Sequence, residues 1–140
     1  MGVTDFDTKV AVVVRDDLAA WQRLNVTAFL ISGVTAAAGA RIVGKPYQDA
    51  DGEQYLPLLR QPVLVYAASG TKLATVARRA REREAPFALY TAEMFATGHD
   101  DANRAAVEAV ATEDRDLVGV ALRAPHNVAD GVLRGLKRHP

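Results

Sequence analysis

Residues 9 to 18 read KVAVVVRDDL, and this stretch decides the fold. Its apolar run, Val10 to Val14, is largely β-branched and stops abruptly at Arg15-Asp16-Asp17. Such a run is typical of a strand that is covered on both faces, as in an α/β sheet. The charged break follows the strand, at the carboxyl edge where open α/β sheets bind ligands. The stretch therefore predicts a fold class and the place of a site, but it names no reaction.

The composition is that of one domain with a substantial apolar core. The chain has 140 residues, of which 49% are hydrophobic, as expected for a single globular domain. Its 17 basic and 17 acidic residues balance, which argues against a protein dedicated to binding nucleic acid. The chain has no cysteine, so disulfides, thiolate metal sites and cysteine nucleophiles are excluded.

The sequence predicts a cytoplasmic protein without membrane contact. No apolar run approaches the roughly 20 residues that a membrane span requires. The opening residues, MGVTDFDTKV, lack the basic and apolar regions of a signal peptide. The abundance of arginine and alanine is typical of a GC-rich bacterial source.

Strands and helices alternate along the chain. After the strand at 9–15, Trp21 is the expected packing anchor, and a helix that is apolar on nearly every side is expected at 24–40. Asn25 is the expected N-cap of this helix. Further strands are predicted at 61–68, 87–91 and 116–123, and further helices at 72–84, 103–111 and 125–137. This order predicts a single domain with its core at 9–137, a three-layer α/β/α architecture and a four-stranded, mostly parallel mixed sheet.

A hairpin is expected between the first helix and the second strand. Two extended segments, 42–47 and 54–58, flank Asp51-Gly52, which is a strong turn signal. Pro46 and Pro57 remove amide donors, so the hairpin is expected at an edge of the sheet.

Polar residues that follow the first and third strands form the candidate site. Because these strands are expected to be neighbours, the residues after them should meet at one edge of the sheet. In an enzyme, Glu93 or Asp16 would be the base, and Arg15 or Asn25 would stabilise negative charge. The predicted cleft is lined by Arg15, Asp16, Asn25, Tyr47, Thr91 and Glu93.

The sequence predicts no metal and no cofactor. The acidic segment 49–53 has an EF-hand-like glycine, but neither end position of such a loop would be a carboxylate. His99 is interpreted as a loop residue before a helix, with Asp100 or Asp101 as the cap, and His139 as part of a frayed tail. The glycine-rich phosphate-binding motifs and the nucleophile elbow are absent.

A basic run lies on the predicted helix at 72–84. It contains Arg78, Arg79, Arg81 and Arg83, tempered by two glutamates. A solvated helix face is the favoured interpretation, and an RNA-binding face is the alternative.

Several stretches resemble type II peptidyl-tRNA hydrolases. They are the KVAVVVRDDL opening, the strand at 62–66, the helix at 69–84, the FALYT strand at 87–91 and the closing VGVALRAP at 118–125. The middle stretch, GKPYQDADGEQYLPLLRQPVLVY, is closer to the domain of unknown function 2000 family, which is similar to the hydrolases in fold. The resemblance covers roughly residues 9–137 and implies this fold and pairing into dimers.

The resemblance does not carry the hydrolase activity with it. Where the hydrolases have a Gly-Lys-Gly-Lys segment with a lysine thought to be catalytic, this chain has Trp21-Gln22-Arg23-Leu24-Asn25. Where they have Gln-Asp-Ala-Gly-Arg-Thr, it has residues 90–95, YTAEMF. A cation that could hold a phosphate or an oxyanion is therefore missing, and peptidyl-tRNA hydrolysis is not expected.

The favoured function is a small-ligand-binding or regulatory domain. The alternatives are a hydrolase or transferase of unknown substrate that uses the same cleft, and an RNA-associated module. The apolar helix at 24–40 favours a homodimer.

Overall fold

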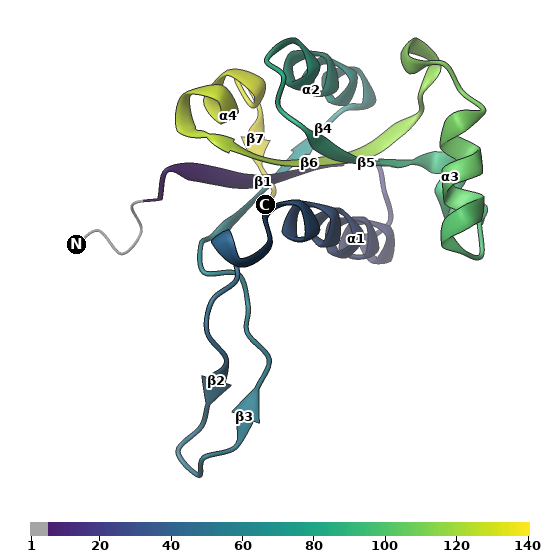
Figure 1. The fold of residues 1–140 in the computed structure, drawn as a ribbon. Helices are drawn as coiled ribbons and strands as arrows, with labels where there is room; N and C mark the ends of the chain where they lie inside the picture. The colour runs from purple at the N-terminus through teal and green to yellow at the C-terminus, as the bar shows by residue number, and fades with distance from the viewer. Residues whose placement is uncertain (1–5) are drawn as a thin grey trace.

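The computed structural model describes residues 6–140, and a five-stranded mixed sheet forms its central layer (Figure 1). The strand order is β5-β6-β1-β4-β7. The sheet strands are β1 (Thr8–Arg15), β4 (Val63–Ala68), β5 (Phe87–Thr91), β6 (Leu117–Pro125) and β7 (Lys137–Arg138). The four α-helices of the described residues are α1 (Ala20–Ala38), α2 (Gly70–Glu82), α3 (Asp100–Glu108) and α4 (His126–Val132).

The prediction that the strands pair mostly in parallel is wrong. Only β1 and β4 pair in parallel in the described sheet, whereas β6 runs antiparallel between β1 and β5. The connection from β5 to β6 contains the short helix α3, which packs against the 3₁₀ helix η2 (Ala92–Ala96) rather than across the sheet. The chain can therefore return in the opposite direction. As a result β1, β4 and β5 still point the same way, but β6 separates β1 from β5.

Helices cover both faces of the sheet (Figure 1). α1 packs on one face, where Val26, Leu30 and Val34 meet the valines of β1 that face this side. α2 and α4 pack on the other face, where the core includes Leu73 and Leu122. The run from Val10 to Val14 is at most 1% exposed, so the prediction of a strand buried on both faces is confirmed.

α1 lies unusually close to the sheet at Gly119 of β6. A Cβ at Gly119 would lie 2.5 Å from Val26 Cγ1 and 2.9 Å from Leu30 Cδ1. Because only hydrogen fits in this space, the helix can approach the sheet more closely here than any side chain would allow. The glycine thus sets the depth at which α1, and everything mounted on it, sits above the sheet.

The predicted hairpin forms, but it is not part of the main sheet. β2 (Tyr47–Gln48) and β3 (Gln54–Tyr55) pair only with each other and project away from the body (Figure 1). The turn depends on Gly52, whose φ is +86°, and on the Asp49 carboxylate. That carboxylate accepts hydrogen bonds from the backbone N–H of residues 51 and 53 and from the Tyr55 hydroxyl at 2.7 Å. These bonds, that of Tyr55 first, lower the pKa of Asp49.

The end of the chain differs from the expected long helix and frayed tail. α4 ends at Val132, a turn follows in which Gly135 has a φ of +84°, and β7 then pairs antiparallel with β4. His139 is tied down as well, because its backbone N–H donates to Val65 and its Nε2 lies 3.0 Å from Arg23 Nη1. The fifth strand was missed because two polar residues carry no strand signal. Among the described residues, no helix is long and apolar enough to cross a membrane.

Candidate functional site

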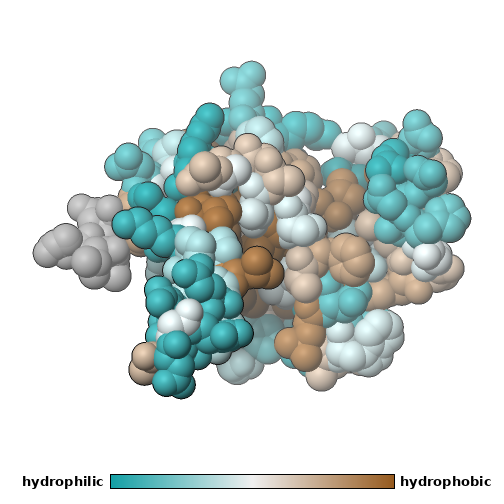
Figure 2. All heavy atoms as spheres, turned by 60° about the horizontal axis from the view of Figure 1, so that its bottom comes forward, coloured by the Kyte–Doolittle hydropathy of each residue, from teal (hydrophilic) through white to brown (hydrophobic). Residues whose placement is uncertain are grey.

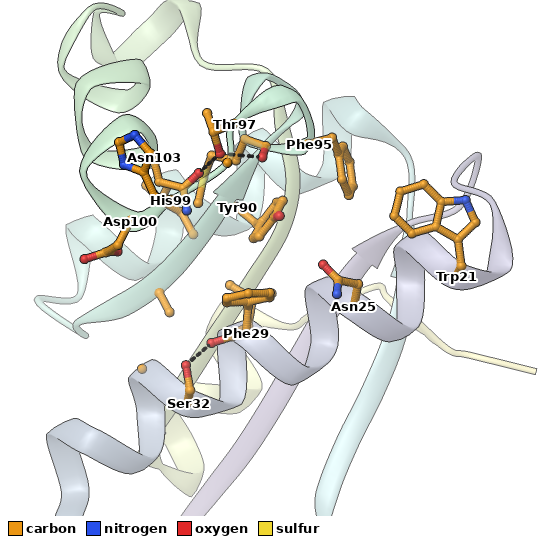
Figure 3. Close-up of a pocket in the computed structure, with 16 residues that line it drawn as sticks. Trp21, Asn25, Phe29, Ser32, Tyr90, Phe95, Thr97, His99, Asp100 and Asn103 are labelled. Atoms are coloured by element: carbon orange, nitrogen blue, oxygen red, sulfur yellow. Dashed lines mark hydrogen bonds between the residues drawn. The ribbon is translucent and has the colours of Figure 1, made fainter.

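A cavity of about 610 Å³ lies between α1 and the segment from β5 to α3 (Figure 3). We call it the aromatic pocket because four rings line it, namely Trp21, Phe29, Tyr90 and Phe95. Trp21 and Phe29 lie on α1, whereas Tyr90 belongs to β5 and Phe95 to η2. These four make up nearly half of the nine aromatic residues of the chain.

The four rings form a continuous series of contacts. The centroids of Phe29 and Tyr90 are 5.9 Å apart, those of Tyr90 and Phe95 are 5.2 Å apart, and those of Phe95 and Trp21 are 5.9 Å apart. These separations lie in the range in which aromatic side chains attract one another. Trp21 and Phe29 nevertheless remain 62% and 54% exposed, so half of this aromatic surface has no partner within the described chain.

Polar groups stand opposite the helix, and most of them are already engaged. Thr97 Oγ1 is hydrogen-bonded to the Met94 carbonyl at 2.9 Å and also to the Asn103 side chain. His99 Nδ1 accepts from the backbone N–H of Ala102 at 3.2 Å and so is the N-cap of α3. The expectation that Asp100 or Asp101 would be the cap is wrong.

Asn25 is the exception among these polar groups. Its amide points into the aromatic pocket, and none of the hydrogen bonds drawn among the lining residues reaches it (Figure 3). The prediction that Asn25 caps the helix is wrong, because α1 begins four residues earlier than expected, with Gln22 Oε1 accepting from the N–H of Ala19. An amide offers both a donor and an acceptor. Asn25 can therefore bind either kind of group on a ligand.

Burial changes the acidity of the tyrosine at the base of the pocket. Tyr90 is only 5% exposed, and desolvation of its phenolate raises the pKa of Tyr90 above the ordinary 10.0. Its hydroxyl therefore keeps its proton at neutral pH and can act as a donor.

The model of one family, described as Protein of unknown function (DUF2000), matches residues 8–140. The chain belongs to the DUF2000 family. The chain is also similar to a solved structure of a protein of unknown function, Atu0240 from Agrobacterium tumefaciens strain C58, with a TM-score of 0.94 and 47% sequence identity. The match covers 97% of this chain and 100% of that one. None of the curated proteins compared with the chain matches it.

In this DUF2000 domain, the residues of the predicted cleft lie in several places. Asn25 lines the aromatic pocket, whereas the pocket walls do not include Arg15 or Asp16. The Arg15 guanidinium is held by Asp17 at 2.7 Å and by Asp116 at 2.8 Å. These two partners, with the Asp17 hydrogen bond first, raise the pKa of Arg15. Asp16 is exposed beside it.

The other three predicted residues also lie outside the pocket walls. Thr91 is 4% exposed, and its Oγ1 is buried without a hydrogen-bond partner among residues 6–140. Glu93 is exposed on η2. Tyr47 lies on the hairpin and lines a separate cavity of about 710 Å³ at its base, with Leu58. Because β6 lies between β1 and β5, Arg15 and Thr91 do not end neighbouring strands, contrary to the expectation.

The sequence did not predict most of the aromatic pocket. Trp21 was expected to be a packing anchor, because aromatic side chains are usually largely buried. The available signal was the clustering of two aromatic residues within one helix and two within one strand-to-loop segment. This clustering predicts a pocket only once it is known that α1 packs against β5.

Proposed function

We propose that this DUF2000 domain binds a small ligand with a planar or apolar body and one polar group, in the aromatic pocket. The observation that supports this most strongly is the convergence of four aromatic rings with the unengaged Asn25 amide. Pockets for small molecules are usually 300–1,000 Å³ in volume, largely apolar, and supplied with a few polar groups that fix orientation. The aromatic pocket matches this description in size and in lining.

The exposed rings indicate where the ligand body would lie. Trp21 and Phe29 extend from α1 toward Phe95 and Tyr90 (Figure 3). A planar ligand placed against the exposed faces of Trp21 and Phe29 would cover aromatic surface that is otherwise in water, which is favourable in proportion to the apolar area removed. Asn25 would then hydrogen-bond a donor or acceptor on the ligand, and the Tyr90 hydroxyl would donate a second bond.

Fluorescence titration tests the proposal directly, because Trp21 is the only tryptophan in the chain. A purine nucleoside, an indole and a phenolic acid are suitable probes, and a bound probe should change the intensity of the Trp21 emission. Binding should also raise the melting temperature. If none of the three probes changes the Trp21 emission in a saturable way or raises the melting temperature, the proposal is contradicted.

An enzyme that acts in this region is the alternative, and its support is weaker. Glu93 and Asp16 would be its bases, but both are exposed and neither lines the aromatic pocket. Arg15 already has two carboxylate partners. A Glu93→Gln variant that folds and loses a measurable hydrolase or transferase activity would support the enzyme over the binding module. The similarity to type II peptidyl-tRNA hydrolases remains part of this proposal at the level of fold only.

An RNA-associated role for α2 also has limited support. Arg79 donates to the backbone carbonyls of Val132 and Arg134, at 3.4 and 2.9 Å, and so holds α2 against α4. Arg78 forms an ion pair with Glu82 at 3.1 Å. Part of the basic run is thus used within the fold, which leaves fewer charges for a phosphate backbone.

We also propose that the domain forms a homodimer through the outer face of α1. Hydrophobic side chains gather over this face beside the largely hydrophilic hairpin (Figure 2), and Leu24 is 74% exposed there. Exposed apolar patches of this kind mark association surfaces. With Leu24 exposed, this side of α1 is not part of the core of the described chain. A cytoplasmic location and a bacterial source complete the proposal.

A further inference from the structure

A further, smaller cavity lies at the amino end of β1, opposite the edge where the sequence predicted a site. Its volume is about 220 Å³, and it shares no lining residue with the aromatic pocket. Three arginines line it from three separate parts of the chain. Arg41 belongs to η1 (Gly39–Arg41), Arg60 to the segment after the hairpin, and Arg123 to β6.

Arg123 contributes a buried N–H donor that lacks a hydrogen-bond acceptor. Its side chain leaves β6 on the face that α1 covers, beside the carboxyl end of that helix. The Nε atom of Arg123 is buried and has no hydrogen-bond partner among residues 6–140. Buried donors in native proteins are almost always paired, because an unpaired one loses its hydration without compensation. A group that accepts a hydrogen bond from this atom would remove the penalty.

The other two arginines add charge that the described chain does not neutralise. The ion pairs within residues 6–140 involve Lys9, Arg15, Arg78 and Arg104, and none involves the three arginines of this cavity. Arg60 lies over the ring of Phe6, with its guanidinium carbon 5.6 Å from the ring centroid. This cation–π contact holds the guanidinium beside the ring without using any of its N–H donors.

The wall of the cavity is rigid. Gln61 is only 8% exposed, and its Nε2 donates to the Thr8 carbonyl at 2.9 Å. This bond ties the segment that carries Arg60 to the first residue of β1. Arg60 is therefore mounted on anchored backbone, whose own N–H also donates to the Ile42 carbonyl at 2.8 Å, as a preorganised binding site requires.

We propose that this cavity binds a doubly charged oxyanion, of the kind presented by a phosphate monoester or a dicarboxylate. The three guanidinium groups and the one acid in the lining, Asp7, give the cavity a net charge of +2, which a dianion neutralises. Guanidinium groups present paired donors that match the oxygens of phosphate and carboxylate. The volume is below the roughly 300–1,000 Å³ of pockets for drug-sized ligands, so it suits one such group.

Isothermal titration calorimetry with methyl phosphate and with malonate, at matched ionic strength, tests the proposal. The variants are Arg123→Gln and Arg60→Gln, and the matched control is Arg78→Gln, which removes the same charge from the exposed side of α2. We expect each of the first two to weaken binding about 10-fold or more, as for the loss of a hydrogen bond to a charged group. The control should bind like the unaltered protein.

The outcomes distinguish a phosphate monoester from a dicarboxylate as the ligand, or show that the cavity is not a binding site. Binding of methyl phosphate alone supports a phosphate monoester as the ligand, and binding of malonate alone supports a dicarboxylate. Binding of neither probe, or equal weakening in Arg78→Gln, overturns the site. If Arg123→Gln does not fold by circular dichroism, Arg41→Gln replaces it. Because the readout does not involve Trp21, this result is independent of the proposed ligand of the aromatic pocket.

Discussion

Trp21 and Phe95 meet edge to face across the aromatic pocket, with ring centroids 5.9 Å apart and an interplanar angle of 70°. One ring is carried by α1 and the other by η2, so their contact exists only when these two elements are docked. Trp21 therefore reports on the integrity of the pocket as well as on its occupancy.

Removal of the Phe95 ring should open the pocket on one side. In Phe95→Ala, Trp21 loses its ring contact and becomes more exposed, so its emission maximum should move to longer wavelength and the affinity for an aromatic probe should fall. Tyr47→Ala, which removes an exposed ring from the hairpin, is the control and should leave the emission unchanged. An unchanged spectrum in Phe95→Ala would show that Trp21 does not depend on this contact in solution.

Asn25 should matter for binding and hardly at all for stability. Its amide has no partner among the pocket residues drawn in Figure 3, so Asn25→Ala should change the free energy of unfolding by no more than about 0.5 kcal/mol. The affinity for a probe that quenches Trp21 should fall about 5- to 10-fold, as for one lost hydrogen bond. Asn127→Ala, at an exposed position of α4, is the matched control. Equal affinities in the two variants would exclude Asn25 from the site.

Gly119 should tolerate no side chain. A methyl group there would lie 2.5 Å from Val26 Cγ1, so Gly119→Ala must displace α1 or distort the sheet. We expect a loss of about 1–3 kcal/mol in the free energy of unfolding, measured by urea denaturation. In Gly98→Ala, the new methyl group meets no atom within 4 Å, so this variant should be close to neutral. Similar midpoints for both variants would contradict the close approach of α1.

Tyr90 should make the fold sensitive to high pH. Burial raises the pKa of Tyr90 above 10.0 in the folded state, so the folded protein holds this proton more tightly than the unfolded chain does. The resulting stability is fully present below about pH 10 and is lost as the pH rises through the raised value. Tyr90→Phe should remove this part of the alkaline loss in a series of thermal melts. An identical pH profile in both proteins would show that Tyr90 is not desolvated.

The dimer proposal predicts a specific sensitivity on α1. Leu24→Asp places a charge on the exposed apolar face and should convert the dimer to a monomer in sedimentation velocity experiments. Leu56→Asp makes the same change on the hairpin, where Leu56 is 85% exposed, and should not. A monomeric unaltered protein would contradict the proposal, and dissociation by Leu56→Asp alone would move the interface to the hairpin.

The sequence predicted local structure well because local signals determine it. The buried run of β1 and the turn at Gly52 both depend on residues close together in the chain. The order of the strands depends instead on where β6 inserts, and no local pattern records that a strand runs antiparallel between two others. The mixed strand pairing could therefore not be predicted from local sequence patterns.

The candidate site was harder to predict than the fold for the same reason. Arg15 and Glu93 were grouped because their strands were assumed to be neighbours, and the insertion of β6 removes that basis. The arginine cavity joins residues 41, 60 and 123, which have no motif in common. Asn25 was placed in the site because of its position after the first strand. It does line a pocket, but with the four aromatic rings rather than with the other predicted residues.

The position of β6 also has a consequence for biosynthesis. β1 and β5 are joined in the sheet only through β6, residues 117–125, which pairs with both of them. A nascent chain that lacks this strand holds two exposed apolar segments with open hydrogen-bonding edges, which is the condition that favours aggregation. The ribosome must release nearly the whole domain before the sheet can close, so folding should be late and cooperative rather than progressive along the growing polypeptide.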